Sequence, residues 1–101
     1  RGPKRVILEA AAAADTKDAP LPQELVTQWR MERYGALPRA GGLDDQPAGL
    51  IQRAETAAVV YSAMRNAARL SAKEFQRNAS EYRAWQMVLS LRRERSAIGD
   101  L

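Results

Sequence analysis

Four cations at regular spacing are the side chains in this sequence most suited to binding a ligand. They are Arg65, Arg69, Lys73 and Arg77, which recur every four residues. On a continuous helix, residues four apart lie on neighbouring turns of one face, so the four would form a row. Such a row can bind phosphate groups through charge and counterion release, or it can face an acidic protein surface. The alternative is a solvated helix face whose cations pair in part with Glu74 and Glu81.

The sequence lacks the side chains on which most catalytic and metal sites depend. It contains no His and no Cys, so the usual general base, thiol nucleophile and zinc ligands are missing. Asp44 and Asp45 form the only acidic cluster, and adjacent carboxylates before a proline are typical of helix caps. Gly41-Gly42 lacks the Lys-Ser/Thr that ends a phosphate-binding loop. We therefore expect no enzymatic activity, no metal and no cofactor.

Positive charge is concentrated in the second half of the chain. The 101 residues carry a net charge of +4. Residues 1–64 contain eight basic and eight acidic side chains, whereas residues 65–95 contain eight basic and three acidic ones. No apolar run approaches the roughly 20 residues that a membrane span needs, and residues 6–14 are too short and alanine-rich for a signal peptide. The length fits one domain, and we expect no contact with a membrane.

The run over residues 47–95 predicts either one long amphipathic helix or two helices that meet near Ser71. Its first part has apolar residues at alternating spacings of four and three, namely Leu50, Ala54, Ala57, Tyr61, Met64 and Ala68. This rhythm is typical of helices that pack on other helices. Ser71-Ala72-Lys73-Glu74 is a capping-box sequence, which favours a new helix start. The absence of Gly and Pro between residues 50 and 97 favours an unbroken helix, so both alternatives stay open.

The segments just before this run predict a short helix and a turn. Residues 21–34 predict the helix, with Leu21, Leu25 and Trp29 on one face, and Gly35 is expected to cap it. Residues 36–46 read as a turn that folds the short helix back on the long one as an αα-hairpin.

Inside this turn, Leu37 and Leu43 are expected to tuck under the long helix. Asp44 or Asp45 is expected to cap that helix.

Residues 1–20 predict an irregular N-terminal arm that ends in a linker. The alanine run over residues 10–14 favours a helix by propensity, but Val6-Ile7-Leu8 suits a strand as well. We expect either a loose arm or an arm that orders on a neighbouring subunit. The predicted fold is all-α, with residues 1–20 as the arm and linker and residues 21–101 as a helical hairpin or small helical bundle.

The end of the short helix and the following turn carry a recognisable pattern. The segment Trp29-Arg30-Met31-Glu32-Arg33-Tyr34-Gly35-Ala36-Leu37-Pro38 precedes Gly41-Gly42-Leu43-Asp44-Asp45-Gln46-Pro47 and a long helix. This resembles small proteins encoded in the tail modules of phages and prophages, which share a Trp-Arg-x-Glu-Arg-aromatic-Gly helix end and a Gly-Gly-x-x-Asp-Gln-Pro turn. The similarity covers about residues 25–65, less than half of the chain. Those proteins are generally regarded as tail assembly chaperones or minor tail-associated factors without enzymatic activity.

The resemblance implies a non-enzymatic phage protein-interaction factor, either a tail assembly chaperone or a small virion component. It would act in the host cytoplasm during assembly or in the virion. Because an alanine-rich stripe buries little area on one chain, we expect a protein partner or self-association through helix packing. The expected apolar contacts are Trp29, Tyr61, Phe75, Tyr82, Trp85 and Leu89. The alternative is a basic helical module that binds nucleic acid through the four cations.

Overall fold

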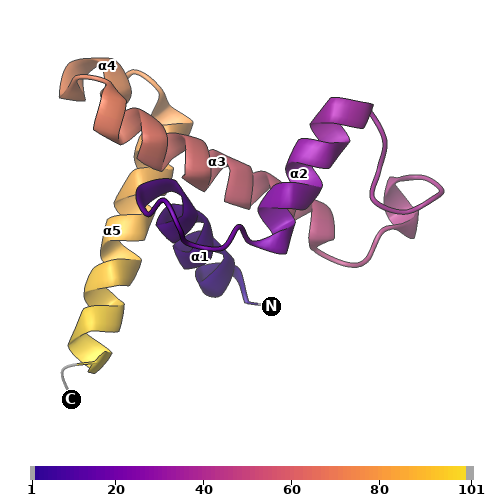
Figure 1. The fold of residues 1–101 in the computed structure, drawn as a ribbon, viewed down its shortest axis with the longest axis horizontal. Coiled ribbons are helices and arrows are strands. Elements are labelled where there is room, and N and C mark those ends of the chain that lie inside the picture. The colour runs from indigo at the N-terminus through magenta and orange to yellow at the C-terminus, as the bar shows by residue number, and fades with distance from the viewer. Residues whose placement is uncertain (1, 100–101) are drawn as a thin grey trace.

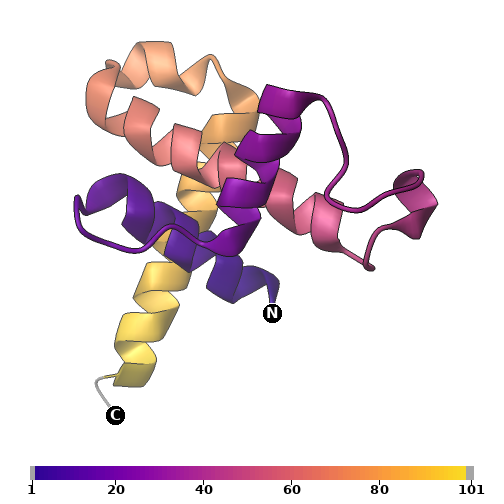
Figure 2. The ribbon, with the colours of Figure 1, turned by 45° about the vertical axis from the view of Figure 1, so that its right-hand side comes forward.

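One central helix organises the molecule. The computed structural model describes residues 2–99, which form five α-helices and one short 3-10 turn. The elements are α1 (Pro3–Asp15), α2 (Gln23–Tyr34), η1 (Leu43–Asp45), α3 (Leu50–Arg69), α4 (Ala72–Gln76) and α5 (Ala79–Gly99). α3 lies in the middle and contacts the other four α-helices (Figure 1, Figure 2). No strand occurs in residues 2–99, so the all-α prediction is confirmed.

The core lies where α1, α3 and α5 meet, and Leu25 of α2 extends it. Its buried members are Val6, Ile7, Ala10, Ala11, Leu25, Ala57, Val60, Met64, Val88 and Leu91. The alanines let the helices approach closely, because interaxial distance depends on the side chains at the contact. Of the stripe predicted on α3, Ala57 and Met64 are buried, whereas Tyr61 is half-buried and Ala68 is exposed. The other helices of the same chain therefore cover much of the surface that we expected a partner to cover.

The irregular arm predicted for residues 1–20 is wrong over Pro3–Asp15, which is the helix α1. Pro3 suits the first turn, where its missing N–H is not needed, and the alanine run favours continuation. The buried side chains of α1 lie on one face, at Val6, Ile7, Ala10 and Ala11. Helix and strand propensities alone leave the choice between the two states open. Burial of this face against other helices decides it in favour of the helix.

Two long-range ion pairs connect α1 with α5. Lys4 Nζ lies 3.3 Å from Glu94 Oε1, and Arg92 Nη2 lies 2.7 Å from Asp15 Oδ2. The N-terminal helix is thus bonded at both of its ends to the last helix, and it belongs to the same core as the rest of the chain.

The short helix behaves largely as predicted. α2 packs against α3, as expected for the hairpin. It ends at Gly35, whose φ of 63° is left-handed and whose N–H donates to the Met31 carbonyl at 2.8 Å. Glycine reaches this conformation without the steric cost of a Cβ atom.

The long run breaks near Ser71, so the second of the two open alternatives is correct. Leu70 is extended with ψ of 158°, and α4 begins just after Ser71. The Ser71 hydroxyl accepts from the Glu74 amide at 3.2 Å and donates to the Glu74 carboxylate at 3.0 Å. The first of these bonds gives the Glu74 amide, in the first turn of α4, a hydrogen-bond acceptor. Both bonds stabilise the break.

A second break, not predicted from the sequence, lies at Asn78. Its side-chain oxygen accepts from the Glu81 amide at 3.2 Å, which caps the first turn of α5. The two breaks turn the chain so that α5 packs back against α3 (Figure 1).

Candidate functional site

Five of the six apolar side chains predicted to contact a partner form two aromatic clusters within the molecule, and the sixth is Leu89. Trp29 of α2 meets Tyr61 of α3 edge to face, with ring centroids 5.1 Å apart. This pair contributes to the α2–α3 contact, and both rings remain half-buried. Such aromatic pairs are worth about 0.5–1.5 kcal/mol beyond their buried area, so this contact stabilises the fold itself.

The second cluster joins α4 to α5. Phe75 is 4 % exposed, and its ring centroid lies 6.0 Å from that of Tyr82 and 5.8 Å from that of Trp85. Tyr82 and Trp85 stack on each other at 5.8 Å. Leu89 is half-buried, and the buried positions of α5 are instead Val88 and Leu91. The six residues therefore do not form one continuous docking face.

The four predicted cations are all exposed, but they do not form the single row expected of a continuous helix. Arg65 and Arg69 lie on the last turns of α3, Lys73 lies on α4, and Arg77 follows the end of α4. The extended Leu70 interrupts the row, because it changes the chain direction between the second and third cation. All four stay within one segment at the end of the molecule where α3 gives way to α4 (Figure 1).

The acids expected to pair with these cations are engaged elsewhere. Glu74 accepts from the hydroxyl of Ser71, and Glu81 accepts from the side-chain amide of Asn66 at 2.6 Å. Among the described residues, none of the four cations forms an ion pair. The expected pairing with Glu74 and Glu81 is therefore not found among the described residues, whereas the exposure of all four cations agrees with a solvated face.

The loop between α2 and α3 is held by its own polar side chains. The Arg39 amide donates to Gln46 Oε1 at 2.9 Å, and Gln46 Nε2 donates back to the Arg39 carbonyl at 2.9 Å. Asp45 Oδ2 accepts from the Gly42 amide at 2.7 Å. At Gly41, φ is +104°, and a Cβ atom there would overlap the Asp45 carboxylate. This loop projects from the helices and has a defined internal structure (Figure 2).

Of the two loop leucines predicted to tuck under the long helix, Leu37 is half-buried and Leu43 is exposed. Leu43, predicted to tuck under the long helix, is 64 % exposed, because it stands in the 3-10 turn at the tip. Asp45 bonds to the loop and does not cap α3, which starts after Gly49. Tyr34 at the end of α2 is 69 % exposed. Polar and apolar residues have no regular spacing in this short loop, so its sequence does not reveal which side chains face solvent.

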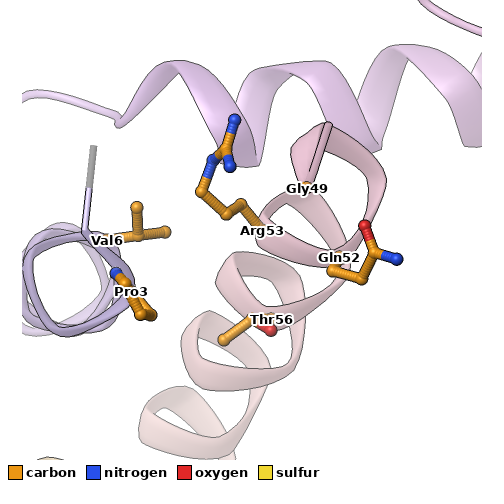
Figure 3. Close-up of a pocket in the computed structure, with 6 residues that line it drawn as sticks. All are labelled: Pro3, Val6, Gly49, Gln52, Arg53 and Thr56. Atoms are coloured by element: carbon orange, nitrogen blue, oxygen red, sulfur yellow. The ribbon is translucent and has the colours of Figure 1, made fainter. Parts of the chain in front are cut away.

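A pocket of about 330 Å³ lies between α1 and the first turns of α3 (Figure 3). Pro3 and Val6 form the α1 side, and Gly49, Gln52, Arg53 and Thr56 form the other. Arg53 Nη1 donates to the Ala48 carbonyl at 3.3 Å, and its Nε is buried without a hydrogen-bond partner among the described residues. No nucleophile and base stand together in this lining, so it offers no arrangement for acid–base or nucleophilic chemistry.

Within the described part of the chain, no group of three or more His, Cys, Asp or Glu side chains is placed to hold a metal ion. No helix of residues 2–99 combines the length and apolar character that crossing a bilayer requires.

Comparisons with known proteins give no match: no protein-family model, curated protein or solved structure is significantly similar to this chain.

Proposed function

We propose that this protein is a non-enzymatic protein-interaction factor of the kind found in phage tail modules. It acts either as a tail assembly chaperone in the host cytoplasm or as a small component of the virion. The observation that carries the proposal is the loop over residues 36–49, which presents exposed Leu43 on a hydrogen-bonded frame. A loop that is already ordered loses little conformational entropy when a partner binds it.

The proposed contact lies at the loop and not at the helix seam that is expected from the sequence. The seam on α3 is largely covered by α1 and α5, whereas Tyr34 is exposed just before the loop and Leu43 is exposed at its tip. Apolar and aromatic side chains of this kind are enriched at the centres of protein interfaces. The same residues belong to the segment that resembles the phage proteins, which supports a shared role for the loop.

The test is co-purification of the chain with tail proteins encoded in the same phage module. Leu43→Ser is expected to remove most of the bound partner, because it deletes the largest apolar contact of the loop tip. Met87→Ser is the matched control, since Met87 is 49 % exposed but lies on α5. Equal binding by wild type and Leu43→Ser, or no partner for either, would overturn the proposal.

A second measurement separates the two forms of the proposal. Mass spectrometry of purified particles detects a virion component in stoichiometric amount. An assembly chaperone is instead present in infected cells and missing from finished particles.

A further inference from the structure

The turn from α3 into α4 concentrates four cations, none of which forms an ion pair with a described residue. Four cations fall within thirteen consecutive residues, Arg65, Arg69, Lys73 and Arg77. The only acid within that span is Glu74, and its carboxylate accepts from Ser71 at the cap of α4. Elsewhere the molecule does pair its charges, as at Lys4 with Glu94 and Arg5 with Glu9.

The two arginines of α3 are held in place by neighbouring groups that carry no net charge. The guanidinium of Arg65 lies 5.9 Å from the centre of the Tyr61 ring. Arg69 Nη2 donates to Asn66 Oδ1 at 3.0 Å. Because these contacts orient the side chains without neutralising them, the positive charge remains available to a ligand.

A shallow groove runs beside these arginines. It has a volume of about 460 Å³ and lies between the C-terminal ends of α1 and α3, where Arg65, Asn66 and Arg69 form one side. Asp15 lies on the other side, but its carboxylate is bonded to Arg92 at 2.7 Å. Arg92 therefore compensates the charge of Asp15, and the groove keeps an excess of positive charge from Arg65 and Arg69.

We propose that this end of the molecule binds duplex nucleic acid through its backbone phosphates, without reading sequence. The surface has the charge of a phosphate-binding site but lacks the apolar centre of a protein interface. Large exposed apolar side chains occur among the described residues at Leu21, Tyr34, Leu43, Val59 and Met87, and none of these lies in residues 65–77. The centres of protein interfaces are enriched in aromatic residues and Met as well as Arg, and this surface exposes arginines without the aromatic and Met side chains.

The same surface favours a duplex over a single strand. Proteins that bind single strands without sequence preference stack the bases on exposed aromatic rings. The one aromatic residue between 65 and 77 is Phe75, which is buried. A duplex presents its phosphates outward and needs no stacking platform, so it fits a surface made of cations alone. This inference is independent of the loop and of the proposed function.

Fluorescence anisotropy of a short labelled DNA duplex, titrated with the full chain at several salt concentrations, tests the proposal. With four phosphates contacted, affinity is expected to fall about a hundredfold between about 50 and 200 mM salt. Replacing Arg65, Arg69, Lys73 and Arg77 together by Gln is expected to abolish binding at the lower salt concentration. A labelled single strand of the same length is expected to bind more weakly than the duplex.

The control variant carries the same loss of charge at another place. It replaces Lys17, Arg30, Arg33 and Arg39 by Gln, four cations that are also exposed. The control is expected to keep most of the affinity, and thermal melting checks that both variants remain folded. If the fourfold variant does not fold, Arg77→Gln alone is expected to reduce the salt slope by about one.

Three results would overturn the proposal. The first is a wild-type affinity that does not change with salt. The second is an equal loss in the two fourfold variants, which would mean that net charge alone drives binding. The third is displacement of the duplex by polyglutamate as effectively as by unlabelled duplex, which would indicate an acidic protein as the ligand.

Discussion

Asn66 near the end of α3 donates its side-chain amide to the Glu81 carboxylate in the first turn of α5, at 2.6 Å. The two residues are fifteen positions apart, and the bond spans both helix breaks. It is part-buried, and it joins the start of the returning helix to the end of α3.

Asn66→Ala is expected to lower the free energy of unfolding by about 1 kcal/mol or more, because a hydrogen bond to a charged group is lost. Urea denaturation measures the change. The control is Gln86→Ala, an exposed amide on α5 that should change stability by less than about 0.5 kcal/mol. If Asn66→Ala is as stable as the control, the bond does not anchor α5.

Val6→Ala tests whether α1 belongs to the core. Val6 is fully buried, so its truncation should cost about 2 kcal/mol from lost burial and the cavity left behind. Val59→Ala removes the same groups from a site that is 38 % exposed on α3, and it should be nearly neutral. Thermal and chemical unfolding compare the pair, and equal effects would place α1 outside the folded unit.

Ser71→Ala removes the cap of α4 and is expected to destabilise the protein by about 1 kcal/mol. Ser62→Ala, at an exposed position inside α3, should be neutral or slightly stabilising because alanine favours a helix. Differential scanning calorimetry can rank the two variants. A neutral Ser71→Ala would indicate that packing alone sets the break.

Gln46→Ala is expected to loosen the loop without unfolding the helices. The Arg39 amide loses its acceptor, so its hydrogen exchange should accelerate roughly tenfold, the equivalent of about 1.4 kcal/mol. NMR measures the exchange rate of the Arg39 amide directly. Asp44→Ala changes a neighbouring exposed side chain, and it should leave Arg39 exchange unaltered. An unchanged rate in Gln46→Ala would show that the loop does not depend on this clamp.

Local signals in the sequence predict the ends of helices better than their assembly. Gly35 ends a helix as predicted, and Ser71 starts one as in one of the two alternatives left open, because capping depends on residues a few positions away. The state of residues 3–15 could not be read the same way. Val6-Ile7-Leu8 fits a strand or a helix, and the deciding contacts come mainly from α3 and in smaller part from α5, both distant along the chain.

The candidate sites were also predictable from local sequence patterns only in part, because their environment depends on contacts that these patterns do not encode. The four cations were identifiable by their spacing, but whether they were neutralised depended on where Glu74 and Glu81 made their bonds. The exposed position of Leu43 follows from the clamp that Gln46 forms with Arg39, a contact between residues seven positions apart in a loop. No periodic pattern encodes such a contact.

The pairing of α1 with α5 has a consequence for how the protein is made. Lys4 and Glu94 are 90 positions apart, so the first helix leaves the ribosome long before the last helix, which completes the core that α1 forms with α3. At roughly 5–20 residues per second, this core stays incomplete for several seconds or longer until Val88 and Leu91 emerge. This core is therefore completed late in translation. We expect substitutions in α5 to lower the yield of newly made protein before they change its other properties.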